Sequence, residues 1–141
     1  MKTVLFTLMA LTASIAAAQN KLTIVVDGIE KTEGTILAAV YDSTGFLRKP
    51  AYAGLVAVES EEASVVIENI APGEYAVSIF HDENGNYKLD TSGTFNIPTE
   101  KTGFSNNARG TRGAPTFADC MIKIEEDGVI YITLWKYTLE M

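Results

Sequence analysis

Apolar residues recur at every second position along most of this chain, and this pattern constrains its fold more than any other feature. A period of two places successive side chains on opposite faces of a β-strand, whereas a helix needs a period of about 3.6. Gly45 and Pro50 interrupt the one segment that could hold a helical turn. We therefore expect an all-β protein of about seven strands, over residues 22–26, 36–40, 55–59, 65–70, 75–80, 120–125 and 130–134.

Short alternating strands separated by polar turns are typical of two packed sheets. We predict an Ig-like or prealbumin-like two-sheet sandwich, with a single β-barrel as the structural alternative. Glu126-Asp127-Gly128 separates two alternating apolar runs. This turn composition predicts that the last two strands form a hairpin.

The first 18 residues have the features of a signal peptide. Lys2 supplies a positive charge, an apolar run follows over residues 4–11, and Ala16 and Ala18 precede an expected cut at Gln19. The alternative is an N-terminal anchor that stays uncut. The apolar run is too short to span a bilayer, so we expect no membrane span. The sequence predicts an exported protein, periplasmic or extracellular, whose residues 19–141 form one sandwich domain.

The charge balance and the cysteine count limit the function further. The chain has a formal net charge of −7 and a single cysteine, Cys120. A negative surface argues against nucleic acid and anionic lipid, both of which attract clusters of Lys and Arg. One cysteine excludes an intrachain disulfide, so the domain depends on its core or on a metal. We expect Cys120 to be a small buried hydrophobe in a strand.

Residues 82–115 contain no convincing strand pattern. Connections of this length are uncommon in compact domains and are usually functional or disordered. Leu89, Phe95, Ile97 and Phe104 lie within the segment and need a surface to pack on. We expect one long ordered loop that covers one end of the sandwich.

The loop begins with a candidate cation site. Counting Asp82 as position one, Asn84, Asn86 and Asp90 fall at positions three, five and nine, and the Lys88 carbonyl falls at position seven. Oxygens at this spacing bind Ca²⁺ in EF-hand loops, and a set of carboxylates and amides suits Ca²⁺ better than Zn²⁺ or copper. The site residues of this hypothesis are Asp82, Asn84, Asn86, Lys88 and Asp90.

Two features argue against a full EF-hand loop. Position twelve, where an EF-hand carries a bidentate Glu, is Gly93 here, and Glu100 is a substitute from farther along the loop. Asp, Asn and Gly are also the favoured residues of plain solvated turns. Ca²⁺ binding and an ordinary turn therefore both stay open, and a bound ion would have the structural task of ordering the loop.

A second candidate surface lies around residues 104–112. Phe104 offers an apolar platform, and Asn106, Asn107 and Arg109 are polar groups that could receive a sugar or a carboxylate. The hypothesis is a carbohydrate- or peptide-binding module, with a glycan or an exported protein as partner. The structural alternative is that the Asn side chains satisfy loop backbone groups while the arginines pair with nearby carboxylates.

Little in the sequence indicates catalysis. His81 is the one histidine, and the alternation of residues 75–79 places it on the core side at a strand end. Ser105 and Cys120 lie in no recognisable nucleophile motif. We therefore predict a non-catalytic domain. An enzyme of unrecognised type centred on His81 and Asp82 is the third hypothesis.

The turn Pro72-Gly73-Glu74-Tyr75-Ala76-Val77 resembles that of transthyretin-like and carboxypeptidase-regulatory-like sandwiches. A longer and more specific match consists of His81-Asp82-Glu83-Asn84-Gly85-Asn86, Gly103-Phe104-Ser105-Asn106-Asn107-Ala108 and Gly113-Ala114-Pro115-Thr116-Phe117. The chain resembles the exported bacterial family catalogued as domain of unknown function 2141. The resemblance implies an exported Ig-like or transthyretin-like sandwich and no particular activity. Tyr87 departs from the family pattern, which has a second Gly at this position, and its Cβ resists the positive φ that such a loop needs.

Overall fold

The structure, a computed structural model, describes residues 19–111 and 113–138. The predicted signal peptide therefore lies outside the described residues. Within them the chain forms ten strands, one 3₁₀ turn and one short helix: β1 Asn20–Asp27, β2 Thr35–Tyr41, β3 Tyr52–Ala57, β4 Ala63–Ile70, β5 Gly73–Asp82, β6 Thr91–Ser92, β7 Ile97–Pro98, β8 Thr102–Phe104, η1 Ser105–Asn107, α1 Phe117–Cys120, β9 Ile122–Ile124 and β10 Gly128–Thr133. In this part of the chain no helix is long and apolar enough to cross a membrane.

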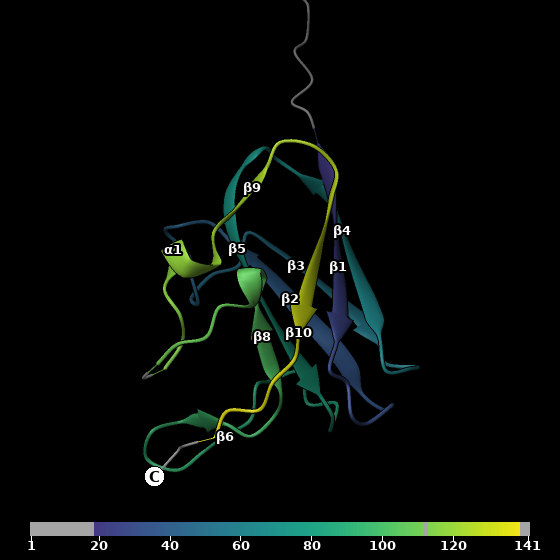
Figure 1. Ribbon diagram of the computed structural model, residues 1–141, viewed down its shortest axis with the longest axis vertical. Helices are drawn as coiled ribbons and strands as arrows, with labels where there is room; N and C mark the ends of the chain where they lie inside the picture. Colours follow the sequence, from purple (N-terminus) through teal and green to yellow (C-terminus); the bar gives the residue numbers. More distant parts are fainter. Residues whose placement is uncertain (1–18, 112, 139–141) are drawn as a thin grey trace, which may run out of the picture.

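The strands form two principal sheets (Figure 1). One sheet has the order β10-β1-β4, and the other has the order β3-β2-β5-β8, with β9 paired to the first residues of β5. All pairs are antiparallel except β1 with β10, which run parallel from Leu22 opposite Gly128 to Asp27 opposite Thr133. A separate hairpin of β6 and β7 extends beyond β8 at the lower end of the molecule (Figure 1).

The core lies between the two sheets and is built from alternate residues, as the period of two requires. Its fully buried members include Ile24, Val40, Ile70 and Val77, each at about 0 % exposure. Ile70, at the end of β4, closes one end of the core. Burying a side chain of this size stabilises the fold by roughly 1.5–3 kcal/mol relative to exposure.

The all-β class is confirmed, and each of the seven predicted strands is present in part or in full. Three further strands, β6, β7 and β8, lie inside the segment that we expected to be free of strands. They are two or three residues long. A pattern with a period of two cannot be recognised over so few residues, because the pairing comes from partners elsewhere in the chain.

The predicted hairpin at the C-terminus is wrong. β9 pairs with β5 and β10 pairs with β1, so the Glu126-Asp127-Gly128 turn carries the chain from one sheet to the other. The Asp127 carboxylate accepts a hydrogen bond from the backbone N–H of Lys21 at 2.7 Å, which fixes the turn beside the start of β1. The turn residues indicated a change of direction correctly, but they carry no information on which strands pair.

Cys120 is buried as predicted, but it ends a helical turn instead of lying in a strand. A capping box starts that turn: the Thr116 side chain accepts from the Asp119 N–H, and the Asp119 carboxylate accepts from the Thr116 N–H. These two bonds satisfy the N–H groups of Thr116 and Asp119, which in a strand would bond to a neighbouring strand. Burial raises the pKa of the Cys120 thiol to about 11, which makes it a poor nucleophile.

Candidate functional site: a covered apolar cavity

The outer face of the β3-β2-β5-β8 sheet is apolar, although it points away from the core. The strand register places Leu55, Leu37, Phe80 and Thr102 in one row across the four strands. An isolated bridge between Thr102 and Trp135 extends this row by one position. Antiparallel sheets that cover a core on one face usually carry polar residues on the other. The apolar composition of this outer face is typical of a sheet face that packs against other groups.

A second row on the same face consists of small side chains. Ala53 pairs with Ala39, Ala39 pairs with Ser78, and Ser78 pairs with Phe104. We call Ala53, Ala39 and Ser78 the small-residue row. Because these side chains are short, the row forms a trough between the large side chains of the first row and Tyr41 on its other side.

Three connecting segments rise around the trough and border a partly open cavity of about 970 Å³. Leu47 comes from the β2–β3 connection, a second group comes from the loop and hairpin of residues 89–98, and a third comes from residues 111 and 113–115. Its described lining residues are Leu37, Ala38, Ala39, Tyr41, Leu47, Ala53, Ser78, Ile79, Phe80, Leu89, Phe95, Asn96, Ile97, Pro98, Thr102, Phe104, Thr111, Gly113, Ala114, Pro115, Trp135 and Tyr137.

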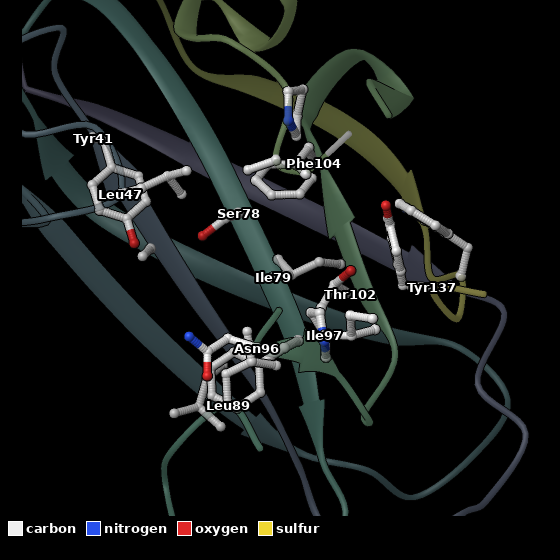
Figure 2. Close-up of a pocket in the computed structure, with 18 of the residues that line it drawn as sticks. Tyr41, Leu47, Ser78, Ile79, Leu89, Asn96, Ile97, Thr102, Phe104 and Tyr137 are labelled. Carbon is white, nitrogen blue, oxygen red and sulfur yellow. The ribbon is translucent and has the colours of Figure 1, made fainter. Parts of the chain in front are cut away.

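Figure 2 shows how these side chains surround the cavity. Ser78 lies in the middle, Tyr41 and Leu47 lie together on one side, and Tyr137 lies on the opposite side. Phe95, at the tip of the β6–β7 hairpin, is the most exposed large hydrophobic residue in the described chain, at 82 %. Exposed apolar side chains around an apolar hollow are typical of ligand-binding grooves.

The described lining contains no charged side chain. Its polar groups are hydroxyls and one amide, from Tyr41, Ser78, Thr102, Thr111, Tyr137 and Asn96, together with the indole N–H of Trp135. That indole nitrogen is buried and has no hydrogen-bond partner among the described residues. The Arg109 guanidinium lies over the Trp135 ring, with its central carbon 5.0 Å from the ring centroid.

The β2–β3 connection is held in place by Asp42. Its carboxylate accepts from the Thr44 hydroxyl at 2.8 Å and from the Gly45 N–H at 2.8 Å, and these bonds lower the pKa of Asp42. The anchored turn presents Leu47 at a φ of +57°. A left-handed conformation costs a leucine roughly 1–2 kcal/mol, so tertiary structure imposes the conformation that places this side chain on the cavity.

The structure brings the candidate cation residues together as a hydrogen-bonded loop. Asp82 accepts from the N–H groups of Gly85 at 3.1 Å and Tyr87 at 2.8 Å. The side-chain amides of Asn84 and Asn86 donate to the two oxygens of Asp90 at 2.6 and 2.7 Å. Thus donor groups of the loop itself approach the Asp90 oxygens. The Lys88 N–H donates to the Asn86 side chain at 3.0 Å, and its carbonyl makes no bond recorded in the described residues.

Glu100 closes this loop from its far side. Its two oxygens accept from the N–H groups of Glu83 and Asp90, both at 3.0 Å. Asp82 and Glu100 are both buried. Among the described residues, no group of three or more His, Cys, Asp or Glu side chains has an arrangement that could hold a metal. Tyr87 takes a φ of +58°, so the loop adopts the conformation that a Cβ at this position opposes.

The predicted ligand surface separates into two parts. Phe104 lines the cavity. Asn106 donates to the carbonyls of Asp119 and Met121, and Asn107 accepts from the Thr133 N–H at 2.9 Å. These two amides therefore satisfy backbone groups, as the structural alternative proposed. Arg109 stacks on Trp135, and neither of the two ion pairs recorded for the described residues includes it.

The groups considered for catalysis lie away from the cavity. His81 is fully buried, and its Nε2–H donates to the Glu33 carbonyl at 2.6 Å. Ser105 is also fully buried: its hydroxyl accepts from the Val77 N–H at 2.9 Å and donates to the Cys120 carbonyl. Neither His81, Ser105 nor Cys120 lines the cavity. Ser105 instead ties η1 to β5 and to the end of α1.

The sequence did carry a signal for the cavity, in the composition of β2. Its residues read Thr-Ile-Leu-Ala-Ala-Val-Tyr, with no charged side chain on either face. A strand that is apolar on both faces is typical of one that is covered on both faces. The position of the covering segments could not be inferred, because the β6–β7 hairpin and residues 111–115 show no periodic pattern.

The fold and the cavity define a β-sandwich domain with a covered apolar hollow on one outer face. The chain belongs to the family described as "Uncharacterized protein conserved in bacteria (DUF2141)", whose model matches residues 24–131. This match confirms the family that the motifs indicated. Searches of curated proteins and of solved structures found no match to the chain.

Proposed function

We propose that this protein is a non-catalytic binding domain that holds a small apolar ligand in the cavity above the β3-β2-β5-β8 sheet. The observation that carries the proposal is a hollow of about 970 Å³ whose described lining has no charged side chain. Ligand sites in proteins have volumes of about 300–1,000 Å³, with mostly apolar walls and a few polar groups. The cavity fits this description at its upper end.

The lining favours an apolar ligand over a sugar. Each Å² of apolar surface that a ligand buries contributes roughly 25 cal/mol, so an apolar ligand gains from nearly every wall of this cavity. A sugar would bring many hydroxyls into the hollow, and each hydroxyl without a partner costs about 1–3 kcal/mol. The few hydroxyls and the one amide of the lining are too sparse to satisfy them. The glycan hypothesis is therefore the second choice for this surface.

A matched pair of serines tests the proposal. Ser78 lies in the floor of the cavity, whereas Ser64 lies exposed on the outer face of the other sheet. A neutral fluorescent probe, N-phenylnaphthylamine, should bind the wild-type protein and Ser64→Phe equally. Ser78→Phe should weaken probe binding at least tenfold, because the phenyl ring occupies the space of the ligand. Equal binding by the two variants, or no binding by the wild type, would contradict the proposal.

We also propose that Ca²⁺ binds at residues 82–90 and stabilises the loop that leads to Leu89 and Phe95. The supporting observation is that Asp82 and Glu100 are buried carboxylates whose recorded partners are N–H groups, with no cationic side chain within 4.0 Å in the described residues. Buried charge is costly unless it is paired. A cation would supply that pairing, after the Asn84 and Asn86 amides rotate their oxygens inward.

Thermal melts in millimolar Ca²⁺ and in chelator test this second proposal. Binding to the folded state alone raises the melting temperature by mass action. The increase should disappear in Asp90→Asn and persist in Asp27→Asn, which removes a carboxylate from another part of the surface. An unchanged melting temperature in the wild type would end the Ca²⁺ proposal and leave the cavity proposal intact.

Finally, we propose that the protein is exported to the periplasm or the medium and that cleavage occurs between Ala18 and Gln19. The support is the charged, apolar and small-residue order of residues 1–18. N-terminal sequencing of the protein from fractionated cells tests it. A mature N-terminus at Gln19 outside the cytoplasm is the expected result, and an intact Met1 on cytoplasmic protein would contradict it.

A further inference from the structure

We infer that the ligand of the cavity is a linear amphiphile, with an alkyl chain that crosses the strands along the small-residue row and an anionic head group beside Arg109. This inference rests on the proposed function and specifies its ligand class. Two independent observations carry it. One is the shape of the cavity floor, and the other is the charge at the Trp135 wall.

The floor has the shape of a trough. Ala53, Ala39 and Ser78 pair in register across β3, β2 and β5, and Phe104 on β8 ends the row. Adjacent strands lie about 4.8 Å apart, so the path across these four strands is about 14 Å long. The row is one side chain wide, with Leu37 and Phe80 on one side and Tyr41 on the other. A single unbranched chain can contact this path along its whole length, whereas a compact ring system would contact only part of it.

The charge lies at the end of the cavity near β8. Trp135 lines the cavity beside Thr102, and the Arg109 guanidinium lies over its ring. Arg109 is exposed, and in the described residues it has no carboxylate within 4.0 Å. Several other described Lys and Arg side chains also lack a recorded ion pair, but Arg109 is the one that lies over an aromatic ring of the cavity lining. The planar guanidinium suits a carboxylate or a phosphate, and its position lets the head group stay in water while the chain is buried.

The head group cannot enter the cavity itself. The described lining has no charged side chain to pair with it, and burial of an unpaired charge costs far more than its hydrogen bonds return. An anionic amphiphile must therefore enter with its chain first and leave its charge at the rim. The pairing at the rim sets which end of the cavity the head group occupies.

Displacement of N-phenylnaphthylamine by hexadecanoate and by hexadecanol tests the inference, because these two molecules share a chain and differ in charge. Hexadecanoate should displace the probe from the wild type at a concentration roughly fivefold lower, as expected for an exposed ion pair. Arg109→Gln should abolish this difference and leave hexadecanol unchanged. Lys88→Gln removes a cation next to Leu89, at another part of the cavity wall, and should preserve the difference.

The outcomes separate the inference from the proposed function. Equal displacement by the two alkyl compounds, or a difference that survives Arg109→Gln, overturns the anionic head group while probe binding still supports an apolar site. Loss of the difference in Lys88→Gln alone overturns its placement beside Arg109. Stronger displacement by pyrene, a compact ring system, than by either alkyl compound overturns the linear chain. Failure of the probe itself to bind contradicts the proposed function.

Discussion

The outward apolar residues on the two faces of this sandwich differ in how far they are exposed to solvent. On the β10-β1-β4 sheet, outward residues such as Val66 and Tyr131 are 50 % and 70 % exposed. On the β3-β2-β5-β8 sheet, the outward residues Leu37, Ala39 and Tyr41 are half-buried, because the connecting segments fold over them. Each face carries apolar side chains, but in the described part of the chain only the β3-β2-β5-β8 face has connecting segments packed over its central part.

This difference shows that the connecting segments create the site, while the strands provide only its floor. The β10-β1-β4 face mixes its apolar side chains with Lys21, Ser64 and Glu68, and the hollow of about 790 Å³ at the end of this sheet is lined largely by charged residues. The covered face lacks such charged residues near its centre. The outward residues of the strands therefore place an apolar cavity on one face and charged, solvated side chains on the other.

The largest effect should come from a glycine that supports the covered sheet. A Cβ at Gly103 in β8 would lie 2.6 Å from Ile132 Cγ2 and 3.2 Å from Ile79 Cγ1. Gly103→Val should lower the free energy of unfolding by about 3 kcal/mol through overpacking, as measured by urea denaturation. Gly128→Val is the control in the open sheet, because the nearest atom to its Cβ lies 4.0 Å away. Equal losses in the two variants would contradict this account of β8.

Ser105 should give the next largest effect, because it ties the covering segments to β5. Ser105→Ala leaves the buried Val77 N–H and Cys120 carbonyl without their partner. We expect a loss of about 2 kcal/mol in the free energy of unfolding. Ser64→Ala on the open face should change it by less than about 0.5 kcal/mol. A catalytic serine would instead be dispensable for stability, so a neutral Ser105→Ala would reopen that hypothesis.

Tyr87→Gly should stabilise the protein. It tests whether a positive φ costs more at Tyr87, in the loop after β5, than at Asn69 in the other sheet. Tyr87 has a φ of +58°, and its side chain is 64 % exposed, so little packing is lost on its removal. We expect a gain of about 1 kcal/mol in the free energy of unfolding. Asn69→Gly in β4, at a φ of +60°, should gain less, because Asn tolerates this conformation. A destabilised Tyr87→Gly variant would show that the tyrosine ring makes an essential contact.

The smallest effect concerns the pH dependence of the β2–β3 connection. The Thr44 hydroxyl and the Gly45 N–H hold the pKa of Asp42 below its ordinary value of 3.8. A lowered pKa in the folded state means that this stabilisation is complete above pH 3.8 and is lost as the pH falls through the folded pKa. The melting temperature of each protein is measured at about pH 5 and about pH 3. Between these two values it should decrease less for Asp42→Asn than for the wild type. Identical decreases in the two proteins would exclude a role for this carboxylate.

The sequence predicted those parts of the fold in which buried and exposed side chains alternate along a strand. All seven predicted strands are such segments, and His81 was correctly placed at the core edge by the same alternation. The pairing of the last two strands was predicted wrongly, because Glu126-Asp127-Gly128 specifies a turn but not its partners. The helical turn that ends at Cys120 depends on the local Thr116–Asp119 capping box. The alternating pattern of residues 120–125 predicted a strand at Cys120 and did not take this local motif into account.

The sites were predictable only where neighbouring residues build them. The loop from Asp82 to Asp90 closes on itself through its own side chains, and its spacing in the sequence indicated this convergence. The contribution of Glu100 was less specific, since it lies outside that spacing. The cavity joins residues from β2, β5, β8 and three connections, and such a combination depends on register and on loop packing. Of the residues predicted for the ligand surface, Phe104 is the one that lines the cavity.

The parallel pairing of β1 with β10 has a consequence for the timing of folding. Leu22 lies opposite Gly128, so β1 cannot complete its pairing until a segment about 100 residues farther along the chain has left the ribosome. Contacts between such distant positions have a high entropic cost and slow the folding of a chain. A nascent chain that stops before β10 exposes one side of β1 as an open edge. Pairing of β10 with β1 thus completes the domain, and a premature stop upstream of β10 should yield an aggregation-prone polypeptide instead of a shorter functional one.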